Sequence, residues 1–354
     1  MTLELRTVGK RVGADMHLYP TSLTLRPGGF NMLLGATNAG KTTLLKLMAG
    51  LESPTEGEIW LNGRDVTKVS PQARNVSLVH QFFVNYPHMT VFENIASPLR
   101  VAGLARAEID ARVGEAAEIL QLQPFLARRP AELSGGQQQR TALARAIVKE
   151  SDLVLLDEPL ANLDYKLREE LRDQLPALFA GRGATVVYAT SEPTEALVLG
   201  GHTATMHEGR VTQFGPTAEI YRAPTDLISA RVFSDPPINT APVEKRGATI
   251  RLREGVEWPA EGAAAALSDG DYVVGLRPHF VAPIQPASAA VRVPGRVQIT
   301  ELSGSESVAH FDIGGLSWVS LADGVHPYRV GEQHDFFIDT SRCLYFGTDG
   351  ARAA

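Results

Sequence analysis

A glycine-rich stretch, followed by a lysine and two threonines, contains the residue types that bind phosphate. Its members are Gly35, Ala36, Thr37, Asn38, Ala39, Gly40, Lys41, Thr42 and Thr43. The two glycines permit tight turns that direct successive backbone N–H groups at an anion, and a helix that starts near Lys41 would add its dipole. Lys41 supplies a positive charge for the β- and γ-phosphates, and the Thr42 hydroxyl can ligate Mg²⁺. We therefore predict that this loop binds a nucleoside triphosphate.

Two carboxylates, Asp157 and Glu158, directly follow an apolar run at residues 153–156. A buried charge is costly unless it is paired, so an acidic pair at the end of a buried strand needs a reason. Asp157 can hold Mg²⁺ through water, and Glu158 can then orient or deprotonate an attacking water. Two solvated acids at a strand end are the alternative, but the phosphate loop upstream favours catalysis.

A second anion site is predicted at the start of a helix. Its members are Ser134, Gly135, Gly136 and Gln137. A serine with two glycines at a helix start offers a side-chain cap and exposed N–H groups to an anion. The alternative is an ordinary N-cap with a flexible entry.

Hydrophobic patterning predicts the elements that position these motifs. An apolar strand at residues 30–34 leads into the phosphate loop, and a helix with an apolar face follows it and ends near Gly50. Residues 90–150 are rich in helix formers, and the apolar runs at 153–156 and 184–190 indicate buried parallel strands.

The chain of 354 residues is too long for one typical domain. From about residue 236, helical periodicity gives way to short β-like runs between prolines and glycines, which is typical of a small all-β domain. We predict an α/β domain at residues 1–235, with a helical subdomain at about 82–150, and a β-rich domain at residues 236–354.

Bulk properties exclude some classes of function. The net charge of −6 gives no electrostatic support for a nucleic-acid partner. The single cysteine, Cys343, cannot form an internal disulfide, which fits a reducing compartment. The start of the sequence lacks the apolar stretch of a signal peptide, and no segment reaches the roughly 18 apolar residues that span a bilayer. We therefore expect any membrane role to come through a partner.

Taken in order, the motifs resemble the signatures of the ATPase subunit of an ABC transporter. These are the phosphate loop, Gln81, Leu-Ser-Gly-Gly-Gln at 133–137, Leu-Leu-Asp-Glu-Pro at 155–159 and Asn-Leu-Asp at 162–164. Residues 86–96 resemble carbohydrate importers of the maltose and glycerol-phosphate type, and Gly275-Leu-Arg-Pro278 resembles their OB-like regulatory domain. The implied fold is a P-loop ABC-type α/β ATPase with a helical subdomain, followed by a small all-β OB-like domain.

The resemblance also implies a reaction, cofactors and partners. ATP and Mg²⁺ would be the cofactors, with Mg²⁺ near Thr42, Gln81 and Asp157. Two such subunits would pair head to tail, so that each ATP lies between one phosphate loop and the other chain's Ser134 region, with Asp164 lining the seam. Gln81 would relay the nucleotide state to two transmembrane permeases. A solute-binding protein would deliver the transported solute to these permeases. The chain would then lie peripherally on the cytoplasmic face of the membrane.

Ser191 departs from this pattern. The family has a histidine that contacts the γ-phosphate after the strand that follows Asn-Leu-Asp, whereas Thr190, Glu192, Glu195 and Ala196 keep the register around a serine here. Serine has a shorter reach and cannot become cationic. Losing such a group costs about 10²–10⁴ in rate.

A second departure concerns the base. The aromatic residue that stacks on adenine in the family should lie near Val12, and residues 11–13 contain none. Tyr19 is nearby but out of register. Stacking on a base is worth roughly 1–3 kcal/mol, so adenine would be held less well.

Both departures affect the half-site that contains this chain's own phosphate loop, whereas Ser134–Gln137 is intact. The hypothesis is a heterodimer in which a second, histidine-bearing ATPase supplies the fully active phosphate loop and Ser191 marks the slow site. The cargo would be a polyol or carbohydrate, with glycerol-type import as the first choice. The alternatives are a homodimeric sugar-importer ATPase that tolerates Ser191, and a soluble ABC ATPase or regulatory binding module without a permease.

Overall fold

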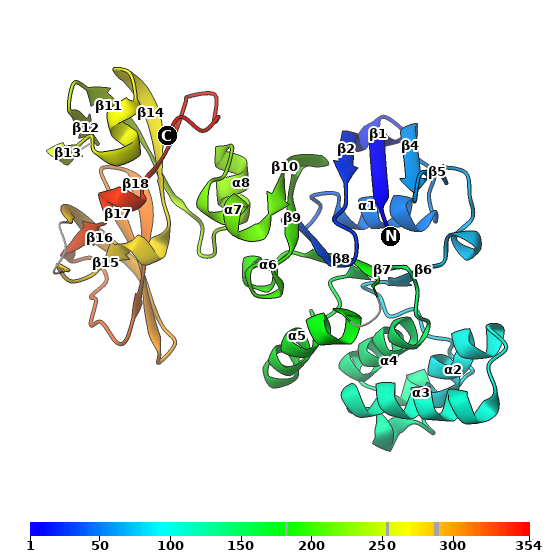
Figure 1. Cartoon of the computed structure of the whole chain (residues 1–354). Helices are drawn as coiled ribbons and strands as arrows, with labels where there is room; N and C mark the ends of the chain where they lie inside the picture. Colours follow the sequence, from blue (N-terminus) through cyan, green and yellow to red (C-terminus); the bar gives the residue numbers. More distant parts are fainter. Residues whose placement is uncertain (181–182, 253–254, 287–289) are drawn as a thin grey trace. The chain divides into compact units, whose positions relative to one another are not determined.

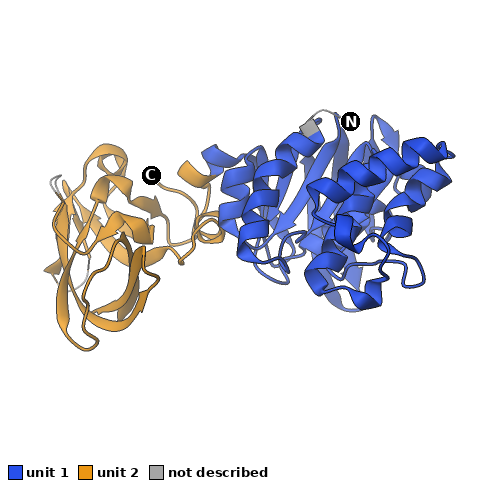
Figure 2. Ribbon diagram, turned by 90° about the horizontal axis from the view of Figure 1, so that it is seen from below, with its two compact units in different colours: residues 1–220 blue, residues 221–354 orange. Residues whose placement is uncertain are grey.

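The computed structural model describes residues 1–180, 183–252, 255–286 and 290–354. The chain divides into two compact units, Met1–Ile220 and Tyr221–Ala354, which Figure 2 colours separately. The boundary predicted after residue 235 lies inside the second unit.

A mixed sheet forms the centre of the first unit. Its strand order is β10-β9-β3-β8-β7-β6, parallel from β9 to β6, with β10 antiparallel at the edge. The strands are β3 (Phe30–Leu34), β6 (Val76–Val79), β7 (Leu153–Asp157), β8 (Thr185–Thr190), β9 (His202–His207) and β10 (Arg210–Pro216). Strands β3, β7 and β8 are buried along their whole length, which confirms the strands predicted from their apolar runs.

An antiparallel sheet with the order β2-β1-β4-β5 packs on the same core. Its strands are β1 (Leu3–Val12), β2 (Asp15–Thr24), β4 (Glu56–Leu61) and β5 (Arg64–Asp65). Helix α1 (Lys41–Ala49) contributes to this core together with residues of both sheets, and Gly50 caps it in the left-handed conformation with φ 77°. The phosphate loop, which lies between β3 and α1, therefore joins two elements with buried apolar faces.

The helix-rich segment predicted at residues 90–150 is confirmed. It contains α2 (Val91–Val101), α3 (Arg106–Ile119) and α4 (Gly135–Val148), which pack on one another (Figure 1). The unit also contains α5 (Tyr165–Ala180) and α6 (Pro193–Leu199), and α7 (Thr217–Arg222) lies at its border. Within the described part of the chain, no helix is both long enough and apolar enough to cross a membrane.

The second unit contains α8 (Leu227–Val232), followed from Asn239 onward by β-strands and short 3₁₀ turns. Two antiparallel sheets, β13-β12-β11-β14-β20 and β15-β19-β16-β17-β18, share one core that includes Trp258, Trp318 and the stacked rings of Phe311 and Phe336. The first sheet contains β11 (Asn239–Arg246), β12 (Thr249–Arg251), β13 (Glu257–Pro259), β14 (Gly270–Leu276) and β20 (Leu344–Phe346). The second contains β15 (Val281–Ala282), β16 (Val291–Leu302), β17 (Glu306–Ile313), β18 (Leu316–Asp323) and β19 (Gln333–Ile338).

Candidate active site

The backbone of the phosphate loop depends on its glycines. A Cβ on Gly35 would lie 2.4 Å from the carbonyl oxygen of Met206, so a side chain cannot be accommodated there without moving the backbone. Gly40 caps the start of α1 with φ 99°, and Asn38 is also left-handed with φ 68°. The loop thus has the tight turns that the sequence predicted.

Lys41 lies at the base of this loop with only 5% of its surface exposed. Its Nζ donates to the carbonyl oxygens of Gly35 at 2.6 Å and Ala36 at 3.0 Å, and lies 3.6 Å from Glu158 Oε1. Burial lowers the pKa of Lys41, and the nearby carboxylates of Glu158 and Asp157 oppose that shift. The ammonium is therefore poorly solvated and suited to bind a phosphate oxygen.

Thr42 and Asp157 meet next to Lys41. The Thr42 hydroxyl donates to Asp157 Oδ2 at 2.9 Å, and burial raises the pKa of Asp157. Both side chains offer the hard oxygen donors that Mg²⁺ prefers, and Mg²⁺ usually completes its shell with waters and substrate phosphates. These residues fit a nucleotide-bound Mg²⁺, which would supply charge neutralisation at the phosphates.

Glu158 is held by contacts from the loop after β6, from α4 and from β8. Its Oε2 accepts from Gln81 Nε2 at 3.1 Å, and its backbone carbonyl accepts from Gln139 Nε2 at 3.1 Å. Its N–H donates to the carbonyl of Ala189 on β8 at 3.0 Å, and its φ is 46°, an uncommon conformation for a residue with a side chain. The predicted members Gln81, Lys41 and Glu158 therefore come together, in a position suited to orient a water.

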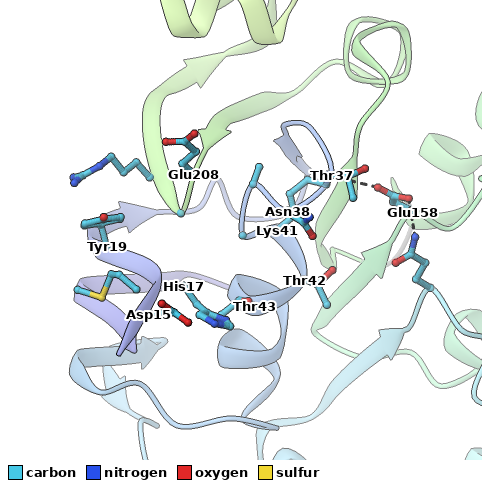
Figure 3. Close-up of a pocket in the computed structure, with 16 residues that line it drawn as sticks. Asp15, His17, Tyr19, Thr37, Asn38, Lys41, Thr42, Thr43, Glu158 and Glu208 are labelled. Atoms are coloured by element: carbon cyan, nitrogen blue, oxygen red, sulfur yellow. Dashed lines mark hydrogen bonds and ion pairs between the residues drawn. The ribbon is translucent and has the colours of Figure 1, made fainter. Parts of the chain in front are cut away.

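A cavity of about 640 Å³ connects these residues. Its lining consists of Asp15, Met16, His17, Tyr19, Thr37, Asn38, Ala39, Gly40, Lys41, Thr42, Thr43, Gln81, Glu158, Glu208, Gly209 and Arg210. In Figure 3, Tyr19 and Glu158 lie on opposite sides of this pocket, with Lys41 and Thr42 between them. The lining thus has a phosphate-binding side and a second side formed by β2 and the β9–β10 turn.

The signature at residues 134–137 lies at the start of α4, and the described lining of this cavity does not include it. The Ser134 hydroxyl accepts from Gln137 N–H at 3.3 Å and Gln137 Oε1 accepts from Ser134 N–H at 3.0 Å, which forms a capping box. Gly136 is tightly packed, since a Cβ there would lie 3.1 Å from the carbonyl oxygen of Asn162.

Asp164 is exposed and accepts from Leu167 N–H at 3.0 Å, near the start of α5. Within one chain, this surface and the phosphate loop are therefore separate features.

Ser191 lies at an exposed bend between β8 and α6. Within the described residues, none of the hydrogen bonds involves its hydroxyl. The residues around it are well held, because the buried Glu195 carboxylate accepts from Tyr188 at 3.0 Å and from Thr190 at 2.6 Å, and burial raises its pKa. The Thr190 carbonyl accepts from Gly35 N–H at 3.3 Å, so this segment is fixed to the phosphate loop.

Some residues of this region were not among the predicted site residues. Tyr19, which is out of register with the family's aromatic position, lies in the cavity lining, whereas Val12 lies outside the described lining. The alternation of β2 was a signal for this, because Asp15, His17 and Tyr19 occupy every second position and so lie on one face of the strand. Gln139 and Arg210 gave no such signal, since their contacts come from distant parts of the chain.

Comparisons with known proteins agree with this geometry. A family model described as ABC transporter matches residues 18–161. Among curated proteins, the chain is similar to the sn-glycerol-3-phosphate import ATP-binding proteins of three bacteria. Identity is 39% for Burkholderia thailandensis, covering 87% of each chain, and 40% for Rhizobium etli, covering 87% of this chain and 85% of the relative. For Yersinia pestis it is 35%, covering 98% of this chain and 97% of the relative.

A solved structure supports the fold. A dimeric ATP-binding cassette in a post-hydrolysis state, bound to ADP and phosphate, is 28% identical with a TM-score of 0.57. It covers 61% of this chain and 98% of its own. The predicted fold class, a P-loop α/β ATPase with a helical subdomain and a small OB-like all-β domain, is confirmed.

Proposed function

Because this chain belongs to the ABC transporter family, among the ATP-binding subunits of carbohydrate- and glycerol-type importers, we propose that it couples ATP hydrolysis to uptake of glycerol 3-phosphate or a related polyol. The family resemblance carried by the motifs is confirmed, and the chain is an ATPase that uses ATP with Mg²⁺. The choice of cargo is supported by the names of the relatives, which are import proteins for sn-glycerol 3-phosphate.

One observation carries the ATPase function: the phosphate loop and Gln81 both contact the acidic pair at the end of β7. Thr42 binds Asp157 at 2.9 Å, Lys41 lies 3.6 Å from Glu158, and Gln81 binds Glu158 at 3.1 Å. A cation, a metal-binding hydroxyl and a water-orienting carboxylate are the parts that phosphoryl transfer to water requires. Their mutual contacts prepare the site before substrate arrives.

The partners follow from import. The chain would lie on the cytoplasmic face of the membrane, bound to two transmembrane permeases that receive cargo from a solute-binding protein. ATP binding would close two cassettes around the nucleotide, and this closure would drive the permeases between inward- and outward-facing states. The dimeric state of the similar cassette supports pairing of two ATPase subunits.

The finer proposal is that the second ATPase is a different chain that carries the histidine. Ser191 is exposed and directly follows Thr190, whose carbonyl accepts from Gly35 N–H of the phosphate loop at 3.3 Å. The Ser134–Gln137 surface keeps its capping box, so it can still serve the phosphate loop of a partner. In the resulting pair, the site with the partner's phosphate loop is fast and the site with Lys41 and Ser191 is slow.

Reconstitution tests the proposal. The chain and its permeases are placed in vesicles with and without a second ATPase subunit of this family that carries the histidine, and ATP turnover and uptake of labelled glycerol 3-phosphate are measured. We expect both activities only with the second ATPase. Turnover at the same rate with this chain as the sole ATPase would overturn the heterodimer, and turnover stimulated by another solute would overturn the cargo.

A further inference from the structure

A tyrosine and an arginine form a flat surface on the side of the cavity away from Glu158. Tyr19 comes from β2 and Arg210 from the first position of β10, and both line the same cavity as the phosphate loop. The Arg210 guanidinium lies 3.4 Å from the centroid of the Tyr19 ring. Tyr19 is half-buried, so part of its ring is covered and part remains accessible.

Backbone hydrogen bonds fix this pair to the phosphate loop. Gly209 N–H donates to the carbonyl of Ala39 at 3.0 Å, and the carbonyl of Gly209 accepts from Tyr19 N–H at 2.8 Å. Gly209 has φ 75°, and a Cβ there would lie 2.8 Å from the carbonyl oxygen of His17, so this turn requires glycine. One residue thus connects the phosphate loop to the aromatic ring on one side and precedes Arg210 on the other. The distance between the phosphate site and the ring is therefore set by backbone contacts.

The chemistry of this pair suits a nucleobase. Every base presents a π face, and aromatic rings and guanidinium planes stack on it without needing specific hydrogen bonds. Val12, near which the family resemblance would place an aromatic residue, is 48% exposed at the end of β1 and lies outside the described cavity lining. A base near Val12 would contact only an aliphatic side chain, whereas a base over Tyr19 would stack on an aromatic ring that Arg210 already contacts.

We propose that Tyr19, backed by Arg210, is the stacking partner of the adenine ring in this chain, in place of the missing aromatic residue near Val12. This inference deepens the proposed function, since it takes ATP as the ligand of that site. It predicts that the loss at Val12 is compensated, so the weak half-site is weak in hydrolysis, because of Ser191, and not in nucleotide binding.

The test compares a ligand that has a base with one that lacks it. Binding of ATP and of inorganic tripolyphosphate, each with Mg²⁺, is measured by calorimetry on the full chain and its Tyr19→Ala and Tyr19→Phe variants. We expect Tyr19→Ala to weaken ATP binding by about 5- to 150-fold, the usual range for a lost stacking contact. It should leave tripolyphosphate affinity unchanged, and Tyr19→Phe should bind ATP like the parent. The matched control is Trp60→Ala, because Arg6 stacks on Trp60 at 4.0 Å in the same unit and neither residue lines the described cavity.

The other outcomes distinguish failure of the stacking role from failure of the proposed ATP-binding function. Unchanged ATP affinity in Tyr19→Ala, or equal loss of both ligands, overturns the stacking role. Failure of the parent chain to bind ATP at all overturns the proposed function instead. If Tyr19→Ala does not fold, photolabelling of the parent chain with 8-azido-ATP decides the matter. Label on Tyr19, Arg210 or their peptides supports the proposal, and label confined to peptides that lack both residues overturns it.

Discussion

Two neighbouring strands of the central sheet differ in the side-chain contacts made by the residues at their carboxyl ends. At the end of β7, Asp157 and Glu158 contact Thr42, Lys41 and Gln81. At the end of β8, which pairs with β7 in parallel, Ser191 lies at an exposed bend. At the end of β7 both carboxylates have side-chain partners, whereas the residue after β8 offers a single small hydroxyl.

This difference separates nucleotide binding from control of hydrolysis. The contacts at the end of β7 all form within this chain. A site that turns over slowly would therefore still need Lys41, Asp157 and Glu158 to form them. Ser191 at the end of β8 is exposed, and none of the described hydrogen bonds involves its hydroxyl, so a change there should leave the fold intact. Under the proposed function, a half-site with serine at position 191 can therefore keep an assembled phosphate loop.

The largest expected effect comes from placing a histidine at position 191. In vesicles that contain this chain as the sole ATPase with its permeases, Ser191→His should raise turnover by about 10²–10⁴, the range that an acid–base residue contributes. Ser191→Asn is the matched control, because it adds a similar reach without an ionisable ring. Equal turnover in all three proteins would show that the end of β8 does not limit the reaction.

The next effect tests the surface that this chain lends to its partner. Ser134→Asp keeps a good N-cap on α4 but places a carboxylate where the partner's ATP would bind. In the complex with the second ATPase, turnover should fall by about 10²-fold, as when a preorganised anion-binding donor is lost. Glu158→Gln in the same complex should have little effect if the proposed heterodimer is correct, because it changes the site proposed to be slow. If Glu158→Gln were the more damaging variant, the assignment of fast and slow sites would be reversed.

A smaller effect is expected on binding. Lys41→Ala removes a buried ammonium, and hydrogen bonds to charged groups contribute about 1.5–3 kcal/mol, so ATP affinity of the isolated chain should fall by about 10- to 150-fold. Lys46→Ala, one turn further along α1, is the control, since Lys46 is 34% exposed and pairs with Glu52. A titration with Mg²⁺-ATP measures both. Similar affinities for the two variants would mean that the phosphate loop does not bind the phosphates.

The parts of the site that the sequence predicted are those encoded by short contiguous motifs. The phosphate loop depends on its own glycines, and Asp157 follows its own apolar strand, so local patterns located them. Contacts between distant segments could not be predicted in this way. Gln139 reaches Glu158 from another element, and Tyr19 reaches the cavity through a hydrogen bond to Gly209, a residue far along the chain. The buried strands β3, β7 and β8 were predicted for the same reason, since their continuous apolar runs are local, whereas the ABC-type and OB-like folds were implied by the family resemblance.

The smallest effect concerns stability. Burial raises the pKa of Asp157 above the ordinary value of 3.8, so in the folded chain its charge is unfavourable. Stability from this group is fully present below the ordinary pKa and is lost as pH rises through the raised value. Asp157→Asn keeps an oxygen that accepts from Thr42 but has no charge, so it should raise the melting temperature of the nucleotide-free chain by about 2–4 °C, or about 1 kcal/mol.

The gain should grow as pH rises above the ordinary value of 3.8 and through the raised pKa of Asp157, because the parent loses stability over that range and the variant does not. Thermal unfolding in the presence of a chelator measures it, with Asp173→Asn as the control, whose side chain is 71% exposed on α5. A destabilised Asp157→Asn would mean that the attraction between Asp157 and Lys41 outweighs the cost of burial. In that case the attraction between Asp157 and Lys41 would stabilise the end of β7 in the nucleotide-free chain. The difference in order between the ends of β7 and β8 would then exist before any nucleotide binds.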